Sequence, residues 1–246
     1  SALRFDSDDK LRFYEVVSGS TTVTKLTTRV FRDVSAWYHI VWSLDTDNST
    51  ASQRMRLYVN GSELTSFSTD SRSSLSGDQA INAAAEHNIG RHPSSTGYGL
   101  GAYLAETHFI DGQAYDPSYF GETSNGVWRP KAYSGSYGTT GFYLSYANSS
   151  AIGDDLSGNN NDFTATNLDA YDVVLDSPTN NFCVMNPLDQ EAQGSNVNLY
   201  RQGNLDVRAT GASTRGKTRG TFAFPASGKW YFEAHHENTV GCVVGI

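Results

Sequence analysis

Paired carboxylates are the first residues to consider, because two acids at the right separation can hydrolyse a glycosidic bond. A retaining glycosidase needs two carboxyl groups about 5–5.5 Å apart. Glu106 and Asp111 are candidates, but a separation of five residues places them on opposite faces of a strand, and Asp111 starts an Asp-Gly turn. The spacing therefore predicts that the protein is not an enzyme.

An oxygen-rich loop is the second candidate for chemistry. Residues 153–162 read Gly-Asp-Asp-Leu-Ser-Gly-Asn-Asn-Asn-Asp. Their carboxylates, amides and carbonyls could supply the about six to eight oxygens that Ca²⁺ prefers, and no other cofactor is expected. The alternative is a solvated turn in which Asn and Asp side chains satisfy nearby backbone groups. The candidate metal ligands are Asp154, Asp155, Asn159 and Asn161, with Asp162 beside them, and Asp45, Asp47 and Asn48 form a second loop open to the same two interpretations.

Aromatic side chains in polar loops could bind sugars, since a ring stacks on the apolar face of a pyranose while neighbouring amides give direction. The alternative is that these rings pack the core or seal contacts between subunits. Because the net charge is −8, strongly anionic polysaccharides would be repelled, so the expected ligands are neutral or weakly charged host-surface glycans. The candidate glycan-binding residues are Tyr98, Tyr103, Trp128, Tyr133 and Tyr137.

The histidines and cysteines carry weaker signals. None of the six histidines has the helical spacing of a metal site, which favours packing or hydrogen bonding for each of them. The two cysteines, Cys183 and Cys242, do not form a CxxC pair, which argues against a zinc ribbon. Two buried free thiols are favoured over a disulfide.

The composition limits the elements that can position these residues. Aromatic residues make up 12% of the chain and charged residues 18%. This mixture is typical of a β-rich protein with many turns rather than of a disordered chain or a helical bundle. The negative net charge argues against a nucleic-acid surface. No apolar run approaches the roughly 18 residues that a membrane span requires, so no membrane insertion is expected.

Alternating stretches predict short strands separated by turns. Between residues 54 and 59, Met55, Leu57 and Val59 fall on one face of a strand, and Arg54, Arg56 and Tyr58 fall on the other. Asn60-Gly61 follows directly. That dipeptide favours a type I′ hairpin, because both of its residues tolerate positive φ. Strands at this spacing predict a sandwich. The predicted strands are residues 11–16, 22–31, 37–44, 54–59, 62–67, 86–91, 102–110 and 141–146, followed near the end of the chain by 204–208, 220–224, 230–234 and 240–246.

Several of these stretches resemble one known superfamily. Trp-Tyr-His-Ile-Val at 37–41 and Arg-Leu-Tyr-Val-Asn-Gly at 56–61 are followed by His-Asn-Ile-Gly at 87–90 and by residues 103–112. This order is similar to the strand series of laminin-G-like, concanavalin A-like sandwiches. The resemblance implies an all-β antiparallel jelly roll over residues 1–122, which lacks the first strands of the family. Enzymes of this class carry a Glu-x-Asp-x-x-Glu triplet, and the sequence has none, which again predicts no catalysis.

The end of the chain resembles a second sandwich. Gly-Lys-Trp-Tyr-Phe-Glu at 228–233, followed by Val-Val-Gly-Ile at 243–246, is similar to the first half of a SPRY domain. The resemblance implies a partial SPRY-like β-sandwich over residues 198–246. Between the two units, residues 123–197 are interpreted as a loop-rich connection that carries the Asp/Asn-rich loop.

The combination of these units resembles structural proteins of marine tailed bacteriophages, namely tail-fibre, capsid-fibre and virion adhesion proteins. The resemblance also rests on the intervening Asp-Leu-Ser-Gly-Asn-Asn-Asn and Asp-Ser-Pro-Thr-Asn-Asn runs. It implies a non-enzymatic protein on the virion surface that binds host-surface glycans or other virion proteins. A homo-oligomer, most simply a trimer, is expected, because repeated weak contacts gain avidity. The alternatives are a carbohydrate-binding module or adhesion ectodomain of a secreted protein and, less favoured, a glycoside hydrolase.

Overall fold

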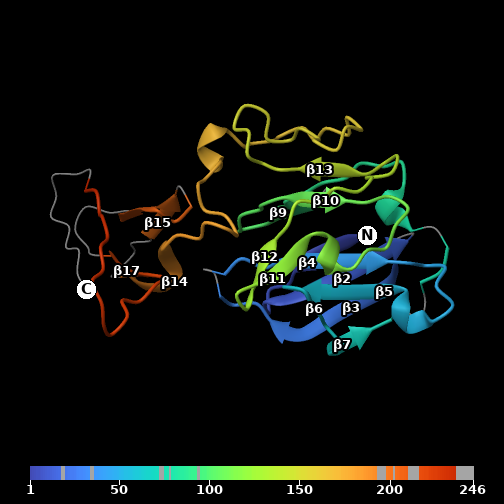
Figure 1. Ribbon diagram of the computed structural model, residues 1–246, viewed down its shortest axis with the longest axis horizontal. Helices are drawn as coiled ribbons and strands as arrows, with labels where there is room; N and C mark the ends of the chain where they lie inside the picture. Colours follow the sequence, from blue (N-terminus) through green and yellow to red (C-terminus); the bar gives the residue numbers. More distant parts are fainter. Residues whose placement is uncertain are drawn as a thin grey trace.

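Antiparallel strands make up most of the regular structure of the protein in the computed structural model (Figure 1). The structure describes residues 1–17, 20–33, 36–71, 75–77, 79–92, 95–192, 198–201, 203–209 and 216–236. Within these ranges the helices are single 3₁₀ turns, η1 (Ala51–Gln53), η3 (Ala80–Asn82), η4 (Pro117–Tyr119) and η5 (Ala170–Asp172). None of them has the length or the apolar character needed to cross a membrane.

The strands are short and pair with antiparallel neighbours, so the all-β prediction is confirmed. In chain order they are β1 (Ala2–Phe5), β2 (Lys10–Val17), β3 (Ser20–Val30), β4 (Ile40–Leu44), β5 (Met55–Val59), β6 (Ser62–Glu63), β7 (Phe67–Asp70), β8 (Arg91–His92), β9 (Ser95–Gly99), β10 (Thr107–Phe109), β11 (Gly121–Ser124), β12 (Val127–Pro130), β13 (Phe142–Leu144), β14 (Met185–Ala192), β15 (Asn198–Arg201), β16 (Asp206–Ala209) and β17 (Gly216–Gly220).

Two antiparallel sheets form the sandwich. One has the strand order β1-β2-β3-β7 and the other the order β4-β5-β6. Side chains from both sheets meet in the core, where the rings of Phe13 and Trp42 lie 4.1 Å apart. Burial of such a side chain contributes about 1.5–3 kcal/mol, so this contact surface is the main source of stability. The centre of the core consists of Phe13, Val23, Met55 and Leu75, each at most 3% exposed.

The predicted hairpin at Asn60-Gly61 is confirmed. Asn60 has φ of 50° and Gly61 has φ of 78°, as a type I′ turn requires. The Asn60 side chain also accepts a hydrogen bond of 2.8 Å from the backbone N–H of His39, which ties the turn to the start of β4. The inward side chains of β5 are buried as predicted: Met55, Leu57 and Val59.

The inward face of the first sheet contains two buried polar side chains, Lys25 on β3 and Glu15 on β2, in positions where a core usually has apolar residues. Lys25 is 1% exposed, and its ammonium group donates to the backbone oxygen of Met55 at 2.9 Å. The same nitrogen lies 4.1 Å from the centre of the Phe67 ring. Glu15 is also buried, and it accepts hydrogen bonds. Because a buried polar group requires partners, these contacts make Lys25 and Glu15 compatible with the core.

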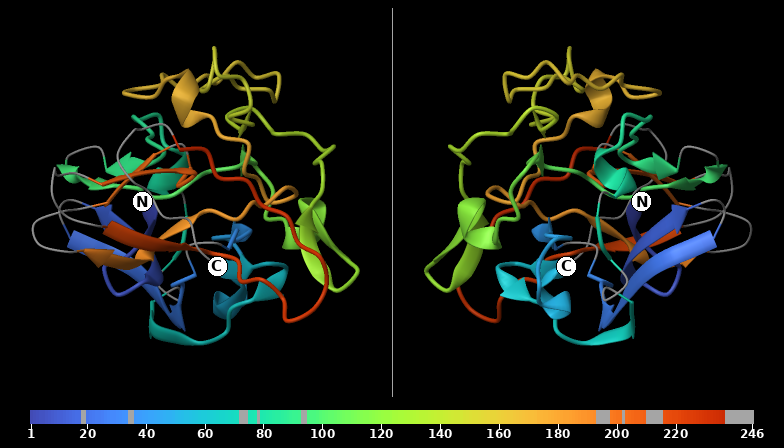
Figure 2. Two further views of the ribbon diagram at one scale, coloured as in Figure 1. Left: turned by 90° about the vertical axis from the view of Figure 1, so that its left-hand side faces the viewer. Right: turned by 90° about the vertical axis from the view of Figure 1, so that its right-hand side faces the viewer.

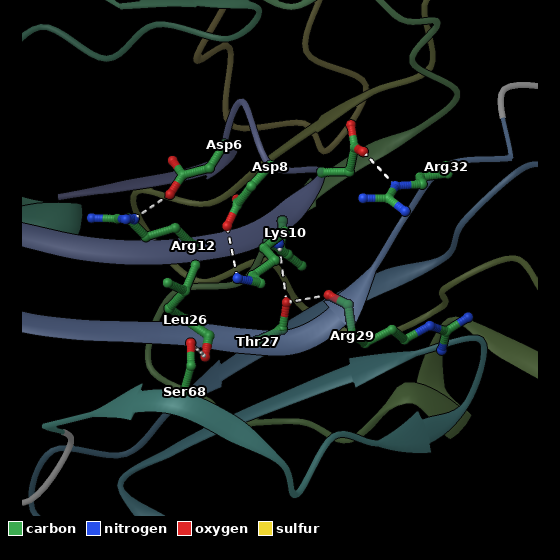
Figure 3. Close-up of polar contacts among 11 residues, drawn as sticks. Asp6, Asp8, Lys10, Arg12, Leu26, Thr27, Arg29, Arg32 and Ser68 are labelled. Atoms are coloured by element: carbon green, nitrogen blue, oxygen red, sulfur yellow. Dashed lines mark hydrogen bonds and ion pairs between the residues drawn. The ribbon is translucent and has the colours of Figure 1, made fainter. Parts of the chain in front are cut away.

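Charged side chains surround the turn between β1 and β2 (Figure 3). Asp6 accepts from the Nε atoms of Arg4 at 2.8 Å and Arg12 at 2.5 Å, and the two arginines lie opposite each other on β1 and β2. Like charges in such positions repel. The Asp6 side chain, which is 10% exposed, offsets that repulsion and so favours this register.

The chain after the sandwich folds back over it. Strand β13 pairs with β10, which places Tyr143 opposite His108. The β11–β12 hairpin lies beside the second sheet (Figure 1), where the Trp128 ring leaves no room for a Cβ atom at Gly61. Residues 145–175 run over one end of the molecule (Figure 2). These contacts join residues 121–163 to the sandwich.

Several predicted strands are shorter in the structure or absent. Strand β4 begins at residue 40 instead of 37, β6 ends at residue 63 and β10 covers only three residues of the predicted 102–110. The predicted strand at 86–91 is wrong, because β8 begins only at Arg91. These stretches have the residue types of strands, but a strand also needs a partner for its backbone groups.

The last part of the chain contributes two small sheets, β14 with β17 and β15 with β16, which lie beside the sandwich (Figure 1). Strand β14 lies inside residues 123–197, which are interpreted above as a loop-rich connection, so this stretch contains regular structure. The predicted strands at 220–224 and 230–234 are also wrong, because β17 ends at Gly220 and coil follows. The predicted strand at 240–246 lies outside the described residues.

Cys183 is exposed, so the prediction of a buried thiol is wrong for this residue. Its neighbour Val184 takes the inward position and is 7% exposed. Neighbouring residues in an extended chain point to opposite sides, which leaves Cys183 on the outer side. Cys242 lies outside the described residues.

Candidate functional site

A tyrosine-lined pocket lies between η4 and the segment that follows β12. It is an open pocket with a volume of ≈ 380 Å³, which is within the range of small-ligand sites. Tyr115 and Tyr119 stack with ring centres 4.0 Å apart, and Tyr133 lies 6.0 Å from Tyr115. The lining residues are Tyr115, Ser118, Tyr119, Lys131, Ala132, Tyr133, Ser134 and Gly135.

The local sequence Tyr-Asp-Pro-Ser-Tyr explains the first wall of the pocket. Asp116 accepts a hydrogen bond of 2.8 Å from the backbone N–H of Ser118, and Pro117 occupies the start of η4. Both residues favour helix initiation, since the carboxylate satisfies a free N–H and proline needs none. The hydrogen bonds from Ser118 lower the pKa of Asp116, so the cap stays charged. This turn places the rings of Tyr115 and Tyr119 in contact with each other.

The second wall continues from β12. The backbone N–H of Lys131 donates to the carbonyl of Phe120 at 2.9 Å, which extends the β11–β12 ladder. The ammonium group of Lys131 donates to the backbone oxygen of Ser118 at 2.6 Å and so joins the two walls. The Tyr133 hydroxyl donates to the backbone oxygen of Ser136 at 2.9 Å. The position of the hairpin therefore decides the shape of the pocket.

Behind the pocket, aromatic rings pack around His108. The His108 ring stacks on Tyr143 at 4.4 Å, and its Nδ1 atom lies 2.8 Å from the Tyr137 hydroxyl. Tyr137 meets Tyr133 edge to face at 5.1 Å, and Phe120 packs 5.0 Å from the same ring. Each such pair contributes about 0.5–1.5 kcal/mol. The packing holds Tyr133 in one position in the pocket wall.

The tyrosine hydroxyls of this cluster keep their protons. Burial raises the pKa of Tyr133 to about 12 and the pKa of Tyr143 to about 12. Burial, together with Tyr143 and Tyr133, also raises the pKa of Tyr137. A protonated phenol donates and accepts hydrogen bonds but is a poor nucleophile. The phenols of this cluster are therefore hydrogen-bonding groups rather than nucleophiles.

The carboxylates considered for catalysis have other partners in the structure. Glu106 lies 3.9 Å from the Nε2 atom of His108 and accepts a hydrogen bond of 3.1 Å from the Tyr143 hydroxyl, and its contacts with His108 and Tyr143 lower its pKa. Asp111 accepts hydrogen bonds from the backbone N–H groups of Thr140 and Thr139, which lower its pKa. The acid of a glycosidase needs a raised pKa, so neither residue is suited to that role.

His39 connects the β11–β12 hairpin to the sandwich. Its Nδ1 atom lies 2.9 Å from the indole nitrogen of Trp128, and the two rings stack at 5.8 Å. Burial, followed by the charge of His108, lowers the pKa of His39. The Trp128 ring also covers Gly61 and Gly121, and a Cβ atom at Gly121 would lie 2.5 Å from it. Trp128 thus fixes the hairpin against the second sheet.

Asp155 organises the predicted metal-binding loop. One of its oxygens accepts from the backbone N–H groups of Tyr143 at 2.8 Å and Ser157 at 2.9 Å. The other accepts from the Ser157 hydroxyl and from the N–H of Asn161, both at 2.9 Å. Burial alone raises the pKa of Asp155, but these hydrogen bonds more than offset it, and the pKa is lowered. The carboxylate is therefore charged, and each of its two oxygens already accepts two hydrogen bonds.

The neighbouring predicted ligands are held in a similar way. The Asn159 amide donates to the backbone oxygens of Gly138 and Gly141, both at 2.9 Å, and the Asn161 amide donates to Gly141 at 3.0 Å. Asp154 is exposed. Among the described residues, no cluster of three or more His, Cys, Asp or Glu side chains is placed to hold a metal ion. The contacts favour the self-satisfied turn over a Ca²⁺ site, and the effect of a chelator on the Tm distinguishes the two.

The second oxygen-rich loop, at residues 45–48, also forms internal hydrogen bonds. The Asn48 amide donates to a carboxylate oxygen of Asp45 at 2.8 Å. The Asn48 side-chain oxygen accepts from the N–H of Thr50 at 3.0 Å. These are the contacts of a turn that satisfies its own polar groups.

The predicted glycan-binding residues are separated in the structure. Tyr133 lines the pocket, and Tyr137 packs directly behind it. Trp128 is bonded to His39 and positions the hairpin instead of lining the pocket. Tyr103 lies elsewhere, beside the turn before β16. Tyr98 belongs to β9, and its side chain lies outside the described part of the chain.

Two residues of the pocket, Tyr115 and Tyr119, are not singled out by their sequence context as ligand contacts. The available signal is the pair Asp116-Pro117 between them, which typically starts a helix. A turn at that point predicts that two tyrosines four residues apart approach each other. The role of His39 has no comparable signal, because its partner Trp128 is 89 residues away.

Comparison with known proteins supports the fold. The family model described as the concanavalin A-like lectin/glucanases superfamily matches residues 2–114, which contain β1 to β10. The match confirms the concanavalin A-like prediction for this part of the chain, and laminin-G-like domains of this kind can mediate adhesion or carbohydrate binding. No curated protein and no solved structure matches the chain significantly.

Proposed function

We propose that the protein is an adhesion module that binds neutral or weakly charged glycans of a host surface in the tyrosine pocket. The observation that carries the proposal is the stacked pair Tyr115 and Tyr119 beside Tyr133 in an open pocket. The apolar faces of sugar rings pack on aromatic side chains, and the hydroxyls of Ser118 and Ser134 offer polar contacts that give direction. A single shallow site of this kind binds with a Kd of roughly 0.1–1 mM.

The module is proposed to be non-enzymatic. The phenols near the pocket keep their protons, and Glu106 and Asp111 have lowered pKa values. A glycosidase needs one carboxyl group that stays protonated near neutral pH and a second one at a fixed distance. Neither acid offers a protonated carboxyl group near neutral pH, which supports binding without hydrolysis.

The proposed setting is the surface of a virion. The sequence resemblance to tail-fibre and capsid-fibre proteins of tailed phages supports this setting, as does the SPRY-like start over residues 198–246. In that setting the partners are other virion proteins and further copies of the chain, most simply in a trimer. Three weak sites on one particle would raise the avidity far above that of a single pocket.

A glycan array tests the proposal directly. An oligomeric form of the protein should bind neutral oligosaccharides, and Tyr119→Ala should weaken binding roughly two- to tenfold, as expected for one stacking ring. Tyr119 is 46% exposed, so its removal leaves the fold intact. Tyr231→Ala is the matched control, because Tyr231 is 82% exposed and outside the pocket. Equal losses in both variants would contradict the assignment of the pocket.

A second assay addresses the absence of catalysis. The wild-type protein should release no reducing ends from the bound glycans over a day. Release that scales with protein concentration and is lost in Glu106→Gln would overturn the non-enzymatic assignment. A blank array would instead favour a purely structural role in the virion.

A further inference from the structure

The hydrogen bond between His39 and Trp128 can form in one direction only, with Trp128 as the donor. An indole N–H can donate but cannot accept. At 2.9 Å the Nδ1 atom of His39 must therefore be the acceptor, and the neutral ring carries its proton on Nε2. Protonation of Nδ1 would set two N–H groups against each other at this distance. This hydrogen bond can persist only while Nδ1 of His39 is unprotonated.

Among the residues that the structure describes, the charged groups acting on His39 already have partners of their own. From β10 and the residue before it, His108 opposes protonation and Glu106 favours it. Glu106 is already engaged with His108 and accepts from the Tyr143 hydroxyl at 3.1 Å. The tyrosines of β13 and of the loop before it are uncharged near neutral pH. From the β5–β6 turn, Asn60 bonds only the backbone of His39.

His108 shows the opposite arrangement. Its Nδ1 atom faces the Tyr137 hydroxyl, which can reverse and accept, and its Nε2 atom faces the Glu106 carboxylate. Each nitrogen of His108 therefore faces a group that can accept a hydrogen bond, whereas Nδ1 of His39 faces a donor.

Trp128 transmits this change to the pocket. Its ring is packed against Gly61 of the second sheet and against Gly121 of its own hairpin. Strand β12, which carries Trp128, leads without interruption into residues 131–135 of the pocket wall. When the indole is released, that wall loses the hydrogen bond that ties β12 to His39 at the start of β4, while Tyr133 keeps its contacts with Phe120 and Tyr137.

We propose that protonation of His39 releases the β11–β12 hairpin and thereby disrupts the tyrosine pocket, so that the module binds glycans at neutral pH and releases them in mild acid. The dependence on a glycan rests on the proposed function, whereas the release of the hairpin does not. One proton is taken up, so the ratio of released to docked hairpin can rise by at most about tenfold per pH unit.

The first experiment observes the protein without ligand. The cross-peak of the Trp128 indole N–H in a ¹H–¹⁵N spectrum, assigned with Trp128→Phe, is followed from about pH 7.5 to about pH 5, together with the ring resonances of Tyr133. Both should move together along a one-proton curve. His39→Asn places an amide oxygen near the position of Nδ1. Because asparagine does not ionise, neither the Trp128 signal nor the Tyr133 signals should change with pH in this variant. His235→Gln, a change at an exposed histidine, should titrate as the wild type does.

The outcomes separate the two proposals. If the Trp128 signal does not titrate in the wild type, or titrates equally in His39→Asn, the switch is refuted whatever the pocket binds. Should His39→Asn fail to fold, Trp128→Phe serves instead: it lacks the donor, so the Tyr133 signals should no longer titrate. In the binding arm, laminarihexaose is titrated by NMR at both pH values. If the Trp128 and Tyr133 signals change with pH but the sugar does not bind at either pH, the pH switch is supported and the proposed glycan function is contradicted.

Discussion

Replacement of Asp155 by asparagine isolates the role of the Asp/Asn-rich loop. The two side chains have the same shape, but asparagine turns one acceptor oxygen into an NH₂ donor and removes the charge. Each carboxylate oxygen accepts from at least one backbone N–H, either Tyr143 and Ser157 or Asn161. Whichever way the amide turns, at least one half-buried backbone N–H loses its acceptor.

The magnitude follows from these contacts. A hydrogen bond to a charged group contributes about 1.5–3 kcal/mol, and an unsatisfied buried donor costs about 1–3 kcal/mol. Since the other bonds of Asp155 lose the assistance of charge at the same time, we expect a loss of about 3 kcal/mol. For a chain of this size, that corresponds to a fall in Tm of about 6–12 °C.

The same carboxylate gives the prediction a pH dependence. Its pKa in the folded protein lies below the ordinary value of 3.8. The stabilisation is therefore complete above pH 3.8 and is lost as the pH falls through the lowered pKa. Wild type and Asp155→Asn should differ fully at pH 7 and converge in strong acid.

Circular dichroism melting at pH 7 measures the effect. Asp154→Asn is the matched control, because it makes the same chemical change at the adjacent, exposed residue. If Asp155→Asn melts within about 1 °C of Asp154→Asn, the hydrogen-bond argument fails, since one buried bond alone is worth more than that.

Three further predictions concern the turn, the metal and the assembly. Gly61→Ala should destabilise the protein in urea by clearly more than Gly126→Ala, because both glycines have φ of 78° but only Gly61 has the Trp128 ring in the place of a Cβ atom; equal losses would point to backbone strain alone. A chelator should leave the Tm unchanged, since the oxygens of Asp155 are already occupied, and a fall in Tm that Asp155→Asn abolishes would establish a Ca²⁺ site instead. Light scattering should give the mass of a trimer, and a monodisperse monomer would count against assembly through this chain.

The parts of the fold that the sequence predicts well are those with local causes. Asn60-Gly61 forms its hairpin because both φ values are set within the dipeptide itself. The burial of Met55, Leu57 and Val59 follows from a period of two. In contrast, residues 86–90 and 230–234 are predicted to form strands but have no strand partner among the residues that the structure describes. Pairing depends on distant residues, and a local pattern does not contain it.

The site illustrates the same limit. Tyr133 is predicted as a glycan contact from its loop composition and does line the pocket. Trp128 has the same residue type and setting, yet it is held by His39, 89 residues away. Lys25 breaks the expected pattern of the core because Met55 offers it a backbone oxygen. Residue type thus identifies which side chains could bind a sugar, and only the tertiary contacts decide which of them are available.

The order of these parts along the chain has a consequence for how such a protein can change. The segment matched by the family model ends at residue 114, and the first tyrosine of the pocket is residue 115. The sandwich and the pocket are therefore consecutive stretches of sequence, joined in space mainly through Trp128 and the β10–β13 pair. Substitutions at the pocket residues Tyr115, Tyr119 and Tyr133 can therefore alter the pocket while the core of the sandwich keeps its packing. If the proposed function holds, such a protein follows a changing host surface by replacing the pocket residues of one short segment on an unchanged frame.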